Sequence, residues 1–225
     1  MDRGTFAQFL MISSALLAER ASPTGVDKGN LYFDELLSIG ATQESLKLQL
    51  GSVPVPPFQV DLWQASAGRS DLRVEFTKGT LDGLPGGVRR FGNASAPGYL
   101  HGNLTLGSHV RFVDVKITCS GKAMGASAAR FNNELTIQTS LMATTALLEV
   151  MAFPPGTPNL FTFMLNGPVN ITVLTPDHAS MSNEERSLYK EQTKKHLSGF
   201  VETLLSTKYR EALRAAVSNK PLPNP

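Results

Sequence analysis

The stretch SNEERSLYKEQTKKHLSGFVETLLSTKYREALRAAVSN, residues 182–219, carries the longest regular pattern in the sequence. Ser182 followed by Glu185 forms an N-terminal capping box, and Glu184 adds a second acid to the first turn. Apolar residues then recur with a period of 3.6, and no proline follows until Pro221: Leu188, Leu197, Phe200, Val201, Leu204, Leu205, Tyr209, Leu213, Ala216 and Val217. The pattern predicts one amphipathic helix roughly 50 Å long. Glu202 points away from the apolar stripe and is expected to contribute little to stability.

A helix of this length needs partners of similar length to cover its apolar stripe. Between Leu62 and Leu174 apolar and polar residues alternate, which is typical of half-buried antiparallel strands. Two segments, 109–120 and 128–141, could reach roughly 35 to 40 Å as strands. We therefore expect an α+β fold in which a long, curled antiparallel sheet wraps around the C-terminal helix.

Two details of the strand region predict local structure. The alternation shifts by one residue after Phe112, and we interpret the shift as a β-bulge inside a strand over residues 109–120. Asn166-Gly167 separates two alternating runs, which predicts a hairpin whose second strand carries Val169, Ile171 and Val173.

The N-terminal residues are expected to be a leader rather than part of the fold. The run from Phe6 to Ala18 is apolar on all sides as a helix and too short to span a bilayer comfortably. It predicts a signal peptide over residues 1–21, the alternative being an N-terminal helix retained in the fold. Residues 22–30 read as a flexible segment, and a helix is expected over residues 30–39. Residues 22–225 then form a single secreted, extracellular domain.

Composition excludes several classes of protein. The net charge is +2 and no run of Lys or Arg occurs, so no nucleic-acid partner is expected. After Ala18 there is no second long apolar run, so the mature chain is not expected to be an integral membrane protein. Cys119 is the one cysteine, which rules out an intramolecular disulfide and a cysteine-rich metal site.

No enzyme signature is present. The sequence has no Gly-x-Ser-x-Gly nucleophile motif and no Gly-rich phosphate loop after a strand. The four histidines do not form a metal pair, although His101 and His109 could meet across a hairpin. Cys119 shares a face with Val115 and Ile117 and is interpreted as a buried, inert thiol. We therefore expect neither catalysis nor a cofactor or metal.

Three sequons for N-glycosylation occur, at Asn93, Asn103 and Asn170. Asn93 lies in a Gly- and Pro-rich turn, so it is expected to carry a glycan before the other two.

The order of these elements resembles the tubular lipid-binding (TULIP) superfamily, and within it the mite group 7 allergens. The resemblance covers about residues 70 to 220 and is densest at Val74-Glu75-Phe76, Gly83-Leu84, Arg89-Arg90-Phe91-Gly92-Asn93, and Leu100 to Ile117. Insect juvenile-hormone-binding proteins share that fold but usually carry an N-terminal cysteine pair, which this chain lacks. The resemblance implies a half-barrel super-roll, an extracellular location and an apolar ligand.

Two classes of function follow. The first is a secreted carrier of a lipid, fatty acid or terpenoid, whose expected lining is Val115, Ile117, Ile137, Phe163, Phe200 and Leu204. The second is a secreted, allergen-like interaction protein with a filled apolar core, whose function lies on its surface loops. The sequence names no protein partner for either class.

Overall fold

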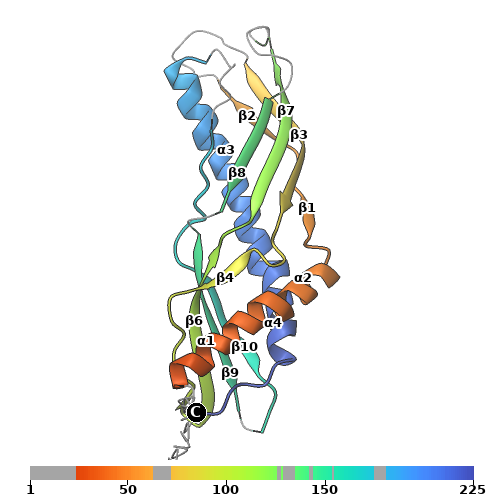
Figure 1. Cartoon of the computed structure of the whole chain (residues 1–225). Helices are drawn as coiled ribbons and strands as arrows, with labels where there is room; N and C mark the ends of the chain where they lie inside the picture. Colours follow the sequence, from red (N-terminus) through yellow and green to blue (C-terminus); the bar gives the residue numbers. More distant parts are fainter. Residues whose placement is uncertain are drawn as a thin grey trace, which may run out of the picture.

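The computed structural model describes residues 24–62, 72–125, 128, 135–141, 144–153, 155–174 and 181–225. The molecule is elongated, with two five-stranded antiparallel sheets at opposite ends and a long C-terminal helix running beside both (Figure 1). The predicted α+β class, with antiparallel strands curled along a long helix, is therefore confirmed. The strands divide into two sheets, which the sequence pattern did not predict. The predicted signal peptide, residues 1–21, lies outside the described residues.

The C-terminal helix is continuous over 36 residues, as predicted. It comprises α3 (Asn183–Leu204), a π-helical segment η3 (Leu205–Tyr209) and α4 (Arg210–Ser218). The Ser182 hydroxyl accepts from the Glu185 amide at 3.2 Å, and the Glu185 carboxylate accepts from the Ser182 amide at 2.8 Å. The predicted capping box is thus formed in both directions.

Sheet A contains β1 (Ser52–Pro54), β2 (Phe58–Asp61), β3 (Arg73–Asp82), β7 (Lys116–Met124) and β8 (Leu135–Ser140). The order is β1-β3-β7-β8, and β2 pairs with the first half of β3 on the same edge as β1. The prolines between β1 and β2 divide this edge into two short strands, since proline cannot donate to a ladder.

Sheet B contains β4 (Val88–Phe91), β5 (Gly98–Leu100), β6 (Asn103–Phe112), β9 (Thr145–Ala152) and β10 (Asn159–Leu165). The order is β10-β9-β6-β4, and β5 also pairs with β6. Side chains of β6 and β9 alternate between buried and partly exposed, so one face of the sheet is inward and the other meets solvent.

The phase shift after Phe112 is not a bulge, and the predicted strand 109–120 is wrong. β6 ends at Phe112 in sheet B, and β7 begins at Lys116 in sheet A. The link between them carries the buried Val115, and the Val113 amide donates to the Gly87 carbonyl. The alternation of apolar and polar residues shifts because the chain leaves sheet B and joins sheet A. In sheet A a different set of alternate residues faces the core.

The predicted hairpin at Asn166-Gly167 is also wrong, because β10 pairs only with β9 in the described part of the chain. Residues 169–174 are extended, and Val169, Ile171 and Val173 are buried. Their backbone bonds to side chains instead: the Val169 amide donates to Glu202 at 3.2 Å, and the Thr139 hydroxyl donates to the Thr172 carbonyl at 2.8 Å. Residues 169–174 therefore show the alternating burial of a strand without pairing with another strand that the structure describes.

The N-terminal helix is longer than predicted and begins inside the expected flexible segment 22–30. α1 (Gly25–Glu35), the π-helical η1 (Leu36–Ala41) and α2 (Thr42–Lys47) follow one another, with Thr24 and Asp27 forming a capping box. This helix crosses α4 (Figure 1), and a Cβ at Gly40 would lie 3.4 Å from the Ala216 Cβ. Small residues at this point allow the two helices to approach closely.

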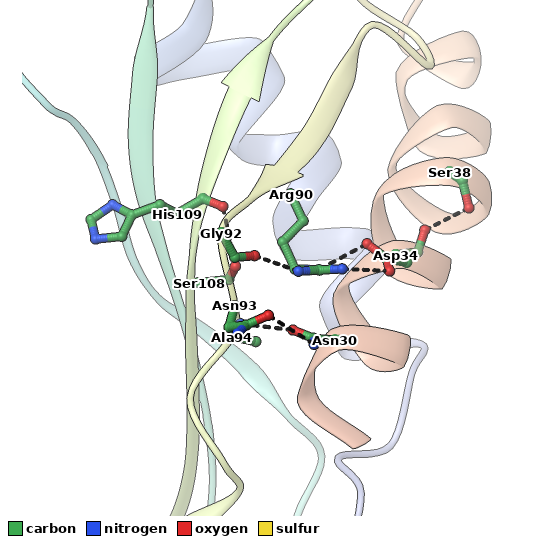
Figure 2. Close-up of polar contacts among 9 residues, drawn as sticks. All are labelled: Asn30, Asp34, Ser38, Arg90, Gly92, Asn93, Ala94, Ser108 and His109. Atoms are coloured by element: carbon green, nitrogen blue, oxygen red, sulfur yellow. Dashed lines mark hydrogen bonds and ion pairs between the residues drawn. The ribbon is translucent and has the colours of Figure 1, made fainter. Parts of the chain in front are cut away.

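An ion pair ties the N-terminal helix to sheet B (Figure 2). The Arg90 guanidinium donates to both carboxylate oxygens of Asp34, each at 2.9 Å, and also to the Gly92 carbonyl. The Asn30 side chain accepts from the Ala94 amide at 2.8 Å and donates to Asn93 at 3.3 Å. These contacts fix the turn after β4 against α1.

One apolar core runs through the inward faces of both sheets, the N-terminal helix and the C-terminal helix. Leu204 is 5% exposed within it, whereas Glu211 on α4 is exposed. We predict that Leu204→Ala lowers the free energy of unfolding by about 2–5 kcal/mol, because truncation leaves a cavity. Glu211→Ala should change it by less than about 0.5 kcal/mol. Equal effects of the two variants in urea melts would contradict this arrangement of the helix.

The expectation that Glu202 contributes little omits a hydrogen bond, because the Glu202 carboxylate accepts the part-buried Val169 amide. We predict that Glu202→Ala costs about 1–3 kcal/mol, since it leaves that amide without its acceptor. Glu202→Gln keeps an acceptor oxygen and should recover most of the loss in the same urea melts. If Glu202→Gln is as destabilised as Glu202→Ala, the loss is due to the charge of Glu202 rather than to this hydrogen bond.

Candidate functional site

The predicted ligand-lining residues all belong to the apolar core or pack against it. Val115, Ile117, Ile137, Phe163 and Leu204 are buried, and Phe200 is half-buried and packed against the same core. Ile117 and Ile137 come from sheet A and Phe163 from sheet B, so the set spans both ends of the molecule. That these residues line a ligand stays a prediction.

Two hydroxyl groups in the interior were missed by the sequence analysis. Tyr189 and Thr193 are both 0% exposed, and neither hydroxyl has a hydrogen-bond partner among the described residues. They lie one turn apart on α3, so they share a face of the helix. The signal was available, because Tyr189, Thr193, Leu197 and Val201 are spaced four residues apart and continue the apolar stripe toward the N-terminal end of α3.

The surroundings of this pair are apolar and belong to sheet A. The ring centroid of Tyr189 lies 6.4 Å from that of Phe76 on β3, and Phe76 stacks on Phe58 at 4.7 Å. Burial raises the pKa of Tyr189, and the neighbouring Cys119 raises it further. Burial also raises the pKa of the Cys119 thiol to about 11. The Tyr189 hydroxyl therefore stays protonated near neutral pH and can donate a hydrogen bond.

A second candidate site lies on the outer face of sheet B. It is a hollow of about 380 Å³ above Gly107, which we call the Gly107 hollow. Gly107 on β6 pairs with Glu149 on β9, so one side of this cross-strand pair has no side chain. The hollow is lined by Asn93, Ser95, Leu100, Thr105, Leu106, Gly107, Ser108, His109, Leu147, Glu149, Val150, Met151 and Phe161.

The polar candidates from the sequence do not form a metal or catalytic centre. His101 lies in the turn before β6, whereas His109 pairs with Phe91 and Leu147 farther along that strand, roughly 20 Å away. They do not meet, because both belong to one connected segment rather than to facing strands. His178 lies outside the described residues. In the described ranges no three His, Cys, Asp or Glu side chains are grouped as metal ligands.

The three sequons differ in exposure. Asn93 and Asn170 are exposed, and Asn103 is half-buried at the start of β6. Asn93 lies in the turn held by Asn30 (Figure 2), at the rim of the Gly107 hollow. Its position in an exposed turn agrees with the predicted order of glycosylation, which itself stays a prediction.

Comparison with known proteins gives one informative similarity. The chain is 19% identical over 217 residues to Salivary anticoagulant protein P23 of the tick Ixodes scapularis, with 95% of this chain and 97% of that protein aligned. No family model matches the chain. The chain is thus similar along almost its whole length to an arthropod salivary protein, which supports the coarser expectation of an extracellular arthropod protein. Within the described residues, no helix is long and apolar enough to cross a membrane.

We predict that Asn93 carries a glycan when the chain is secreted from eukaryotic cells, because its turn is exposed at the surface. Asn93→Gln should reduce the glycosidase-sensitive mass by one glycan, measured by intact-protein mass spectrometry. Asn103→Gln is the matched control. A larger loss with Asn103→Gln than with Asn93→Gln would reverse the predicted order.

Proposed function

We propose that this chain is a secreted, non-enzymatic protein that binds an apolar small molecule with a polar end in the interior between sheet A and α3. The observation that carries the proposal is the pair of buried, unpartnered hydroxyls of Tyr189 and Thr193. A buried hydroxyl without a partner costs about 1–3 kcal/mol. The carboxylate, carbonyl or hydroxyl of a lipid, fatty acid or terpenoid would accept from these groups and offset that cost.

The rest of the ligand would contact the apolar interior. Ile117, Ile137 and Leu197 are buried in the same core, and each ligand CH₂ removed from water contributes about 0.8 kcal/mol. A chain of about ten methylenes gains roughly 8 kcal/mol before the cost of association, which is several kcal/mol. Micromolar affinity with little selectivity among classes of lipid is therefore expected, because few polar groups face the interior.

Secretion is supported by two independent observations. The sequence predicts a signal peptide over residues 1–21, and the chain aligns almost end to end with a salivary protein. We expect N-terminal sequencing of secreted material to find a new N-terminus near residues 18 to 25.

The binding proposal is tested with the delipidated secreted protein and a fluorescent fatty-acid probe. Wild type should bind the probe with micromolar affinity. Tyr189→Phe and Thr193→Val keep the shape of the side chains but remove the hydroxyls, and each should weaken binding roughly fivefold, about one hydrogen bond. Probe titration and native mass spectrometry measure the two effects.

Thr203→Val is the matched control, because Thr203 is an exposed residue of the same helix. It should leave probe binding unchanged. If wild type binds no probe at tens of micromolar and native spectra show only the bare chain, the carrier function is refuted. If wild type binds but both hydroxyl variants bind equally well, the ligand lies elsewhere.

A second candidate function is inhibition of blood coagulation through contact with a protein. It is favoured by the nearly end-to-end alignment with a salivary anticoagulant protein. The surface offers a place for such a contact, since Phe91, Tyr99, Leu100, Phe161 and Met164 of sheet B are exposed. This corresponds to the interaction-protein class, with function on the surface rather than in the core.

We predict that the purified chain prolongs the clotting time of plasma in a dose-dependent way. Replacing Phe161 and Met164 together by serine should shorten the clotting time again without unfolding the protein, because both side chains are exposed. Tyr189→Phe separates the two functions: clotting inhibition should be unaffected while probe binding falls. If wild type at micromolar concentration leaves the clotting time of plasma unchanged, the second candidate function is excluded.

A further inference from the structure

The Gly107 hollow owes its shape to one missing side chain. A Cβ at Gly107 would lie 3.5 Å from Cγ of Glu149, so the Glu149 side chain lies beside the open space. The pairing of β9 with β10 shifts between Leu160 and Thr162, at an irregularity that contains Phe161. Phe161 is 60% exposed and Leu100 is 54% exposed, and both border the hollow. Exposed apolar side chains thus lie beside a carboxylate.

Glu149 is a half-buried acid without a cation. It forms no ion pair and no hydrogen bond in the part of the chain that the structure describes. On the same strand as Gly107, Arg111 pairs with Thr145, four residues before Glu149 on β9 and roughly 13 Å away. Its guanidinium lies 3.9 Å from the centroid of the Phe91 ring. Arg111 is therefore occupied elsewhere.

The neighbouring polar groups also leave Glu149 free to bind a ligand. His109 is held by Asn166, with 3.1 Å between the Asn166 Nδ2 and the His109 Nδ1. The Ser95 hydroxyl accepts from the Gly107 amide at 2.9 Å, which fixes the opposite wall. Figure 2 shows the His109 side chain on the side of its strand away from Arg90 and α1. The Gly107 hollow and the apolar interior thus lie on opposite faces of sheet B.

We propose that the Gly107 hollow binds a small organic cation, a primary ammonium group on an apolar or aromatic body. The Glu149 carboxylate would accept the ammonium hydrogens, and charge-assisted hydrogen bonds of this kind are the strong ones. Leu100, Leu147, Met151 and Phe161 would contact the body, and the Phe161 ring also attracts cations. The volume of about 380 Å³ is in the range of small-molecule sites. This site does not depend on the proposed interior ligand.

The probe for the test is 2-phenylethylamine, titrated by calorimetry into the deglycosylated secreted protein. 2-Phenylethanol has the same body without the charge and should bind at least roughly tenfold more weakly. Glu149→Gln should weaken binding of the amine by the same factor and leave the alcohol unaffected. Gly107→Val should fill the hollow and abolish binding of both. Glu191→Gln on α3 removes the same charge from an exposed position and should change nothing.

Circular dichroism and melting temperature establish that each variant is folded. Equal affinity of wild type for the amine and the alcohol, no binding at millimolar amine, or wild-type affinity in folded Glu149→Gln would each overturn the proposal. Lysine amide acetylated on its α-amino group keeps a free side-chain ammonium, and it represents the basic side chain of a protein partner. If it binds more tightly than 2-phenylethylamine, the hollow receives a side chain rather than a small molecule, and the proposal is likewise overturned.

Discussion

The burial of one continuous stripe along the C-terminal helix holds the two ends of this molecule together. No ladder of backbone hydrogen bonds joins sheet A to sheet B among the described strands. α3 packs against β2 of sheet A, and α4 packs against β10 of sheet B and against the N-terminal helix. The Gln192 side chain strengthens the first contact, because it bonds to both the amide and the carbonyl of Asp61. The relative position of the sheets therefore depends on a helix long enough to reach both.

Because each sheet has one face toward the core and one toward solvent, one architecture offers two chemically different candidate sites. The inward site is apolar, with the Tyr189 and Thr193 hydroxyls as its polar groups without partners. The outward site is open, with both apolar and polar side chains in its lining and with Glu149 as its acid. An uncharged or acidic amphiphile suits the first, and a cation suits the second. The strands of sheet B separate the Gly107 hollow from the core, so occupation of one site does not require the other.

The N-terminal helix closes the core at the sheet B end. Its π-helical segment η1 packs against α4, and Gly40 meets Ala216 at that crossing. The ion pair of Arg90 with Asp34 then orients β4 and the turn that carries Asn93. Since this turn forms part of the rim of the Gly107 hollow, the N-terminal helix shapes the outer site from the opposite side of the sheet.

The sequence by itself determined the elements that depend on local chemistry. The Ser182 capping box, the apolar period of the C-terminal helix and the alternation in β3 are properties of neighbouring residues, and each predicted its element. Only the tertiary structure decided where the chain passes from sheet B to sheet A after Phe112. In the sequence, a one-residue shift in the apolar alternation is the same whether the strand contains a bulge or the chain enters a new sheet. It also decided that Val169 to Val173 are bonded by side chains and not by a strand. The Gly107 hollow could not be predicted from the sequence. It forms because Gly107, which has no side chain, pairs with Glu149 on the neighbouring strand, and the two residues are distant in sequence.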